Sequence, residues 1–227
     1  MSEIKNFDTG IPIESGIKII NLDPKENILN KKKIRNILKK ISESNLDDLS
    51  HNIKNAYHEN AEIYAFHPVN ELKGVDEIID TLWKPLIYSF PDLERRDNLI
   101  IGGSFQNRVY VSTVGHLTGT FAHPWLGVPS NGKTIHLRIC EVHQIENEKI
   151  INSHILIDIM DFIRQAGFWP VNPSLGIEEM WPGPITGDGV TFENLDSDLS
   201  SKNLNQNLTM QRSLNIKPET EFGSTKD

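Results

Sequence analysis

The chain has 227 residues, enough for one domain with flanking segments, and its net charge is −8. Nucleic-acid binding depends on clustered Lys and Arg that contact phosphates, so this negative charge argues against it. The hydrophobic fraction of 37% and the charged fraction of 24% are ordinary for a globular protein. Because Cys140 is the single cysteine and neither a signal peptide nor a bilayer-spanning run is evident, we expect a cytoplasmic protein that does not engage membranes.

The first part of the chain predicts a loose arm followed by a helix. Residues 1–26 carry scattered Gly, Pro and Asn without a hydrophobic period, so we expect no regular structure there. Ile34, Leu38 and Ile41 then form one apolar stripe, which is typical of an amphipathic helix. The basic residues of the same stretch, from Lys31 to Lys40, are expected to form its solvated face.

Two further helices and a short strand are predicted before residue 91. Ser44 and Asp47 have the spacing of a capping box, which predicts that a second helix begins there, with Tyr57 and His58 at its end. Residues 61–66 are typical of a short strand, and the proline that follows soon after ends it. Apolar residues keep a helical period over residues 75–90, within which Pro85 predicts a kink.

After residue 91 the sequence becomes rich in Val, Ile, Thr and Tyr, which predicts strands. The expected strands cover residues 93–102, 108–120, 133–145 and 149–158, and a closing helical turn covers residues 161–166. Helices followed by a run of long strands indicate an α+β fold with a strongly curved antiparallel sheet. We therefore expect an arm over 1–26, one domain over 27–170, and an irregular, largely disordered tail over 171–227.

Ionisable side chains are concentrated in the strand segments, where charged groups are seldom buried unless they are paired or line a cavity. These residues are His116, His136, Arg138, Glu141, His143, His154 and Asp158. Strand alternation puts His136 and Arg138 on one face of the sheet, and Glu141 and His143 on the other. One of these two sets should face the concavity, and the sequence leaves open which one.

Each of these residues also has a structural interpretation. Asp158 could cap the helical turn that follows it, because Asp at a helix start accepts bonds from exposed backbone N–H groups. Trp83 and Trp125 fit a core or a pocket wall. No pair of histidines has the tight spacing of metal ligands, so we expect no metal.

Several segments, taken in order, resemble a known family. They are residues 66–74, 83–86, 89–94, 115–121, 125–129, 141–143 and 158–167. Over about residues 45–170 this set resembles the SnoaL-like polyketide cyclase and ester cyclase group of the nuclear-transport-factor-2-like superfamily. The resemblance implies a cone-shaped curved sheet wrapped by helices, a cystatin-like α+β barrel, with an enclosed pocket.

The same resemblance implies roles for particular residues. In the cyclases an acidic residue on the last strand acts as acid/base in an aldol ring closure, without a cofactor, and Asp158 matches that position. His143 or His116 would hold the enolate or carbonyl oxygen. Further substrate contacts are expected from His67, Trp83, Trp125, His136, Arg138, Glu141 and His154.

The sequence thus predicts a cofactor-independent enzyme that acts on a small carbonyl or ester substrate. A non-catalytic small-molecule binding protein and a dimerising scaffold are the alternatives, and the superfamily implies a homodimer. An enclosed Asp158 with a histidine in reach would favour the enzyme, whereas an exposed apolar face of the sheet would favour dimerisation.

Overall fold

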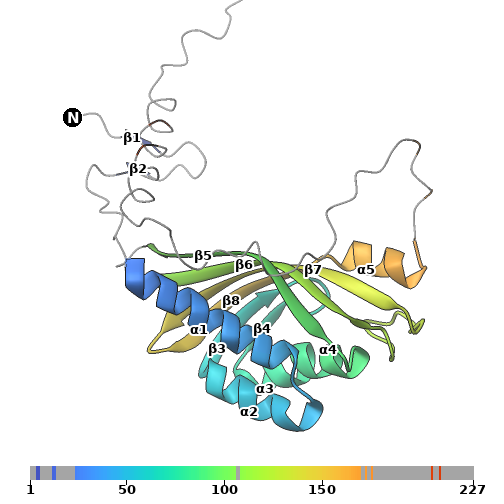
Figure 1. Ribbon diagram of the computed structural model, residues 1–227. Helices are drawn as coiled ribbons and strands as arrows, with labels where there is room; N and C mark the ends of the chain where they lie inside the picture. Colours follow the sequence, from blue (N-terminus) through green and yellow to red (C-terminus); the bar gives the residue numbers. More distant parts are fainter. Residues whose placement is uncertain are drawn as a thin grey trace, which may run out of the picture.

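The computed structural model describes residues 24–105 and 108–169, the backbone of two short segments, and residues 172, 175, 206 and 210. The two short segments, β1 (Ile4–Lys5) and β2 (Pro12–Ile13), pair as an antiparallel ribbon. Figure 1 shows the main body as a curved sheet with helices beneath it, which confirms the α+β fold. The predicted tail over 171–227 lies almost wholly outside the described residues, as does most of the predicted arm.

The first two helices form where the apolar stripes predict them. Helix α1 (Pro24–Ser42) begins slightly before the expected boundary, and α2 spans Leu46–Ala56. The predicted capping box is wrong by one residue, because Asn45 is the N-cap and its Oδ1 accepts a bond from the N–H of Asp48 at 2.8 Å. The expectation of a solvated basic face is wrong for Lys31, which is buried beside the apolar stripe.

The third helical region is continuous but irregular. It consists of α3 (Val75–Glu77), the π-helical segment η1 (Ile78–Trp83) and α4 (Lys84–Ser89). The N–H of Lys84 bonds to the carbonyl of Ile79, five residues earlier. Since Pro85 has no N–H to continue the ladder, the helical irregularity predicted there takes the form of a π-turn just before the proline.

Six strands form one sheet in the order β4-β3-β8-β7-β6-β5. Their bounds are Tyr57–Ala65 (β3), Glu71–Lys73 (β4), Glu94–Phe105 (β5), Arg108–Thr120 (β6), Thr134–Glu146 (β7) and Lys149–Ile157 (β8). The four strands expected after residue 91 are confirmed within about one to three residues. Strand β4 was not predicted, and β3 starts at Tyr57, which the sequence suggested was the end of α2. All neighbours are antiparallel except β3 and β8, which run parallel.

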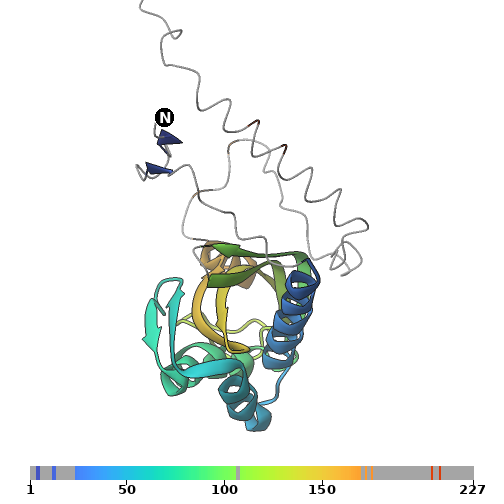
Figure 2. The same ribbon diagram turned by 90° about the vertical axis from the view of Figure 1, so that its left-hand side faces the viewer.

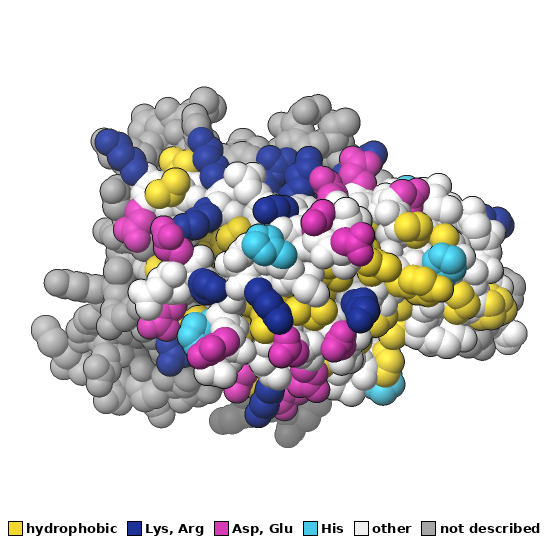
Figure 3. Space-filling model, turned by 90° about the horizontal axis from the view of Figure 1, so that it is seen from below, with side chains coloured by type: hydrophobic (Ala, Val, Ile, Leu, Met, Phe, Trp, Pro, Cys, Tyr) yellow, Lys and Arg dark blue, Asp and Glu magenta, His cyan; other side chains and the backbone are white. Residues whose placement is uncertain are grey.

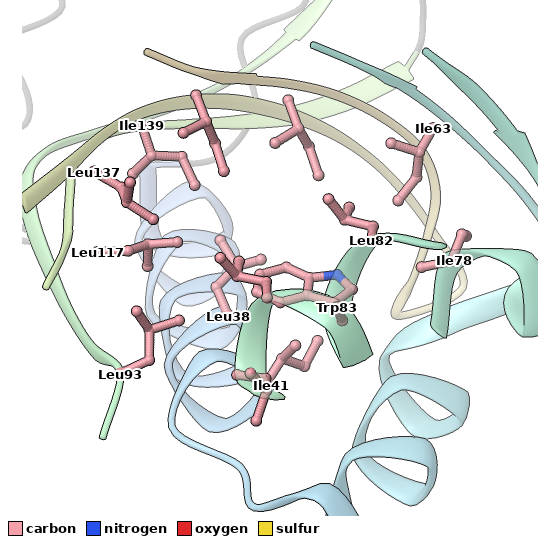
Figure 4. Close-up of a cluster of buried hydrophobic side chains, with 14 of the residues drawn as sticks. Leu38, Ile41, Ile63, Ile78, Leu82, Trp83, Leu93, Leu117, Leu137 and Ile139 are labelled. Carbon is pink, nitrogen blue, oxygen red and sulfur yellow. The ribbon is translucent and has the colours of Figure 1, made fainter. Parts of the chain in front are cut away.

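The concave face of the sheet and the helices enclose the core (Figure 2). Apolar residues alternate along β6 and β7, with Leu117, Leu137 and Ile139 buried on the inside. Figure 4 shows Trp83 between these strands and the helices, surrounded by aliphatic side chains. Burial of each such side chain contributes about 1.5–3 kcal/mol, so this apolar packing is the main force that keeps the helices on the sheet.

Helix α5 (Ile159–Ala166) covers one end of the sheet, and Gly167 ends it with a φ of 94°. Its Phe162 is buried in an aromatic group with Phe90, Phe121 and Trp125, whose ring centroids lie 5.0–6.3 Å from that of Phe162. Offset and edge-to-face contacts of this kind stabilise by more than the buried area alone. Phe162 thereby anchors the helix that follows the last strand.

The face of the molecule seen from below carries acidic and basic side chains in alternation, with a strip of hydrophobic side chains between them (Figure 3). This mixture differs from the single-sign basic stripe that a nucleic-acid-binding face requires. Among the residues that the structure describes, no helix combines the length and the hydropathy of a membrane span.

Gly115 on β6 should be intolerant of any side chain. A Cβ at this position would lie 2.2 Å from the carbonyl oxygen of Arg96 and 2.8 Å from the Cα of Asp97, next to the bulge in β5. We expect Gly115→Ala to lower the free energy of unfolding by about 1–3 kcal/mol in urea denaturation. Gly103→Ala is the matched control, since nothing lies within 4 Å of its Cβ, and an equal loss in both variants would contradict this account.

Candidate functional site

A set of buried polar side chains lies on the concave face of the sheet, where those on the strands point inward because side chains alternate along a strand. We call this set the buried polar cluster. Its members come from β3, η1, β5, β6, β7 and β8, and all are buried: Tyr57, Trp83, Arg95, Asp97, Thr113, Glu141, His143 and Ser153. The strand register brings them together, since Thr113 pairs with Glu141 and His143 pairs with Ser153.

Arg95 is the centre of the cluster. Its Nε donates to Asp97 Oδ1 at 2.8 Å, and its Nη2 donates to Thr113 Oγ1 at 2.8 Å and to Glu141 Oε2. Arg35 on α1 approaches the other oxygen of Asp97, with Nε 3.6 Å from Oδ2. The guanidinium therefore holds two carboxylates in place, as buried charges require if they are to be tolerated.

Glu141 and His143 face the interior from the same strand. His143 Nδ1 lies 2.8 Å from Ser153 Oγ, and its Nε2 lies 3.6 Å from Glu141 Oε2. The hydroxyl of Thr113 also donates to Glu141 Oε2, at 3.0 Å. Ser153 thus fixes the orientation of the imidazole ring, and Nε2 is left beside the carboxylate of Glu141.

Charge and burial set the protonation states of the cluster. Burial alone would raise the pKa of Glu141, but the guanidinium of Arg95 and the neighbouring His143 outweigh it and hold the pKa of this carboxyl well below its usual range. Burial, together with the charge of Glu141, raises the pKa of the Tyr57 phenol. At neutral pH the cluster therefore presents an ionised carboxylate and a protonated phenol.

Five polar atoms of the cluster are buried without any hydrogen-bond partner. Three belong to donor groups, namely Tyr57 Oη, Trp83 Nε1 and Arg95 Nη1. Glu141 Oε1 is an acceptor, and His143 Nε2 donates or accepts according to the tautomer of the ring. Trp83 and Ser153 lie close enough to the phenol to influence its pKa, but their geometry falls short of a good hydrogen bond. Nearly all buried polar groups in proteins have a partner, so five together indicate a place that receives polar atoms from water or a ligand.

Asp158 and His116 lie on the opposite, convex face of the sheet. Asp158 is the N-cap of α5, and its Oδ1 accepts a bond from the N–H of Asp161 at 2.9 Å. Its Oδ2 lies 2.6 Å from Nη2 of Arg138, and the side chain is 36% exposed. The structure thus brings Glu141 and His143 together, but it separates them from Asp158 and His116.

His116, Arg138 and Asp158 form part of a second group, the α5 clamp, which also contains His136, Asp161 and Gln165. Gln165 Nε2 donates to the carbonyl of His136 and to Asp161 Oδ2, at 2.9 and 2.8 Å. Burial lowers the pKa of His116, and the nearby His136 and Arg138 lower it further. These contacts fasten α5 to the outside of β7.

The remaining predicted contacts are dispersed. His67 is exposed after β3, and His154 is exposed on the convex face, where it stacks on Tyr64 with ring centroids 5.0 Å apart. Trp125 belongs to the aromatic group beneath α5. Of the predicted substrate-binding residues, Trp83 and Glu141 belong to the buried polar cluster.

Sequence reasoning did not select Tyr57, Arg95, Asp97, Thr113 or Ser153. Arg95 and Asp97 lie in a run of four charged residues, Glu94 to Asp97, so no hydrophobic alternation in the sequence shows that these two are buried. Tyr57 gave no signal either, since it was assigned to the end of a helix rather than the start of a strand.

A cavity of about 1100 Å³ lies at the ends of β3, β6, β7 and β8, where it is lined by polar residues such as His58, Arg108 and Lys149. It does not include the buried polar cluster, around which an enclosed pocket stays a prediction. Within residues 24–105 and 108–169 no group of three His, Cys, Asp or Glu side chains is arranged to hold a metal ion.

Comparison with known proteins gives a family and a fold. Residues 35–166, more than half of the chain, match the SnoaL-like polyketide cyclase family. A protein from Jannaschia sp. CCS1, described as a SnoaL-like polyketide cyclase, has a similar structure with a TM-score of 0.50 and 17% identity, covering 63% of this chain and 93% of its own. IdmH from Streptomyces antibioticus, described as a polyketide cyclase, gives a TM-score of 0.49 with 15% identity, covering 61% of this chain and 98% of its own. No curated protein sequence matches the chain.

The depressed pKa of Glu141 should appear in the acid stability of the protein. As the pH falls below 4.5, the usual value for this group, the unfolded chain takes up a proton at this carboxyl before the folded protein does. The free energy of unfolding should therefore decline with falling pH, by up to about 1.4 kcal/mol per pH unit from this one group.

Urea denaturation between about pH 5 and pH 3 measures this decline. We expect Glu141→Gln to flatten the dependence, whereas Glu59→Gln, at an exposed position, should retain the wild-type slope. Equal slopes for wild type and Glu141→Gln would show that the buried carboxyl is not held ionised by its neighbours.

Proposed function

Because the chain belongs to the SnoaL-like polyketide cyclase family, we propose that the buried polar cluster binds a small carbonyl compound and transfers protons on it by acid–base catalysis without a cofactor. The observation that carries this proposal is the group of five unpartnered polar atoms on the concave face, namely three on donor groups, one carboxylate oxygen and one imidazole nitrogen. An enolisable carbonyl compound needs this combination, namely donors for its oxygen and an acceptor for the neighbouring proton.

The donors would hold the carbonyl oxygen. Nη1 of Arg95, Nε1 of Trp83 and the hydroxyl of Tyr57 are all buried, so a bond to them would be made in a low dielectric. The raised pKa of Tyr57 favours a phenol that keeps its proton and can donate it in a hydrogen bond. Donors of this kind stabilise the negative charge that develops on an enolate oxygen.

His143 would act as the base. Its Nε2 would accept the proton on the carbon next to the carbonyl, while Nδ1 remains bonded to Ser153. The ionised carboxylate of Glu141, 3.6 Å from Nε2, would stabilise the imidazolium that forms. Because Glu141 is held ionised by Arg95, its role in this proposal is to stabilise charge rather than to take the proton.

Ring closure would follow from the enolate. The electron pair of the broken C–H bond forms a C–C bond to a second carbonyl of the same substrate, whose oxygen then takes the proton back from His143. General acid–base catalysis of this kind contributes about 10²–10⁴-fold to the rate. Holding the two carbonyls close together would contribute further, because the step is intramolecular.

The base can be identified with an exchange assay on a simple ketone. The probe is methyl 4-acetylbenzoate in D₂O, and the loss of its acetyl proton signal is followed by NMR. We expect His143→Gln to lower the catalysed exchange rate by about 10²-fold or more, and Asp158→Asn to retain most of it. Circular dichroism serves as the control for folding.

The variants His143→Gln and Asp158→Asn show which of the two residues is the base. If Asp158 is the acid/base residue, as the family resemblance implies, Asp158→Asn will abolish exchange and His143→Gln will affect it less. A wild-type protein that binds the ketone without catalysing exchange would instead favour the non-catalytic binding protein.

A homodimer is a second proposal, supported by the convex face of the sheet, which lies on the side opposite helices α1 to α4 in Figure 1. Leu156 and Ile101 point outward from β8 and β5 and are 63% and 57% exposed. Ile101, Phe105 and Tyr110 also line a shallow groove of about 380 Å³. A second copy of the chain would cover these apolar side chains, which are otherwise costly to expose together.

Leu156→Asp tests this association by placing a charge on the apolar face. We expect a dimer for the wild type in sedimentation velocity, and a dissociation constant at least about 30-fold weaker for the variant. Leu46→Asp is the control, since Leu46 is also exposed but lies at the start of α2. A monomeric wild type would rule out the proposed dimer.

A further inference from the structure

Three side chains of the buried polar cluster follow one another in space: a serine, a histidine and a glutamate. Ser153 on β8 lies directly opposite His143 on β7, and its Oγ is 2.8 Å from Nδ1 of the ring. At the other ring nitrogen, Nε2 is 3.6 Å from Oε2 of Glu141. All three side chains are withdrawn from water. A hydroxyl, an imidazole and a carboxylate in this order are the parts of a nucleophilic triad, which is recognised by its geometry rather than by sequence position.

The carboxylate of Glu141 is fixed in position and ionised. Nη2 of Arg95 and the hydroxyl of Thr113 both donate to its Oε2. Burial opposes ionisation, but the charge of Arg95 outweighs it and holds the pKa of this carboxyl low. The distance of 3.6 Å to His143 is longer than a hydrogen bond, yet short enough for strong attraction between a carboxylate and an imidazolium. Glu141 can therefore stabilise the positive charge that His143 acquires when it takes a proton from Ser153.

The tautomer of His143 decides what Ser153 can do. A neutral imidazole carries one proton, either on Nδ1 or on Nε2. When the proton is on Nε2, the negative charge of Glu141 stabilises it there, and Nδ1 accepts a bond from the hydroxyl of Ser153. The hydroxyl is then hydrogen-bonded to a base, as a serine nucleophile requires. The acid–base reaction proposed above uses the other tautomer, so one ring would serve two reactions.

Two unpartnered donors lie near Ser153. The phenol of Tyr57 is close enough to both Ser153 and Trp83 for these side chains to influence its pKa, and neither Tyr57 Oη nor Trp83 Nε1 has a hydrogen-bond partner. When a hydroxyl attacks an ester, negative charge develops on the carbonyl oxygen, and buried O–H and N–H groups stabilise it. Burial raises the pKa of the Tyr57 phenol, which therefore keeps its proton and can donate it in a hydrogen bond. A hydroxyl, a base, a carboxylate and donors for an oxyanion are thus present together.

We propose that Ser153 is a nucleophile and that the protein cleaves small acyl esters through an acyl-serine, an activity beyond the proposed function because it needs no enolisable proton. Oγ bonds to the acyl carbon while its proton passes to Nδ1 of His143. The bond from the acyl carbon to the leaving oxygen then breaks, and that oxygen takes the proton from Nδ1. Water repeats both steps on the acyl-serine and releases the carboxylic acid and free Ser153. Since the triad is fully buried, the acyl group should be small.

Two small reagents test the nucleophile on the full chain. Methanesulfonyl fluoride sulfonylates an activated serine with loss of fluoride, and the product is stable enough for peptide mapping by mass spectrometry. We expect the label on Ser153 of the wild type. The second reagent is p-nitrophenyl acetate, a two-carbon acyl ester, and its cleavage is followed by the absorbance of the released p-nitrophenolate. Because the peptide map gives the labelled position, reaction of surface side chains does not affect the first result.

Three variants distinguish a nucleophile from a serine that only orients the ring. Ser153→Ala should lose the label and at least about 10²-fold in the rate of ester cleavage, and His143→Gln should lose a similar factor in cleavage. Ser89→Ala is the matched control and should behave as the wild type, because Ser89 is also buried but its Oγ donates to the carbonyl of Pro124. Circular dichroism checks that each variant folds, and the labelling of the wild type depends on no variant.

The outcomes are distinct for the two proposals. A wild type whose Ser153 stays unlabelled, or a Ser153→Ala variant that cleaves the ester as fast as the wild type, overturns the nucleophile. If that wild type still exchanges the acetyl protons of methyl 4-acetylbenzoate, the acid–base function stands and Ser153 only orients the ring. A labelled Ser153 with ester cleavage but without proton exchange supports the nucleophile and overturns the acid–base function.

Discussion

The buried ion pair between Arg95 and Glu141 governs the interior of this protein. Both side chains are withdrawn from water, and each would be destabilising if the other were absent. Thr113 and Asp97 bind the same guanidinium, so β5, β6 and β7 are joined by one polar network on the concave face of the sheet. His143 lies beside this network and owes its electrostatic surroundings to it.

The alternation of side chains along the strands separates two kinds of polar group. On β7, residues such as Glu141 and His143 face the helices, while Arg138 faces outward and fastens α5. The interior set has unpartnered atoms and can engage a ligand, whereas Asp158 has both oxygens occupied. Because successive side chains of a strand point to opposite faces, the side chains that could bind a ligand lie on the inner face, and those that hold α5 lie on the outer face.

Much of the fold could be predicted from the sequence, because hydrophobic periodicity and turn residues are local signals. The four long strands and the alternation of His136 and Arg138 against Glu141 and His143 are confirmed. The inward face could not be predicted, because it depends on which side the helices cover, a property of the whole chain. For the same reason Lys31 was expected in solvent, whereas its stem lies against β5 beside Gly102, a residue remote in sequence.

The parallel pairing of β3 with β8 has a consequence for how the protein folds. Strand β3 follows the first helices, whereas β8 is the last strand of the sheet, so contacts such as Glu62 with Asn152 close a very long loop. Such contacts raise the contact order, and chains of high contact order fold slowly because the loop entropy is lost before the contact is gained. During synthesis the edge of β3 that pairs with β8 stays unpaired until nearly the whole sheet has left the ribosome. Until then this edge is exposed to other chains.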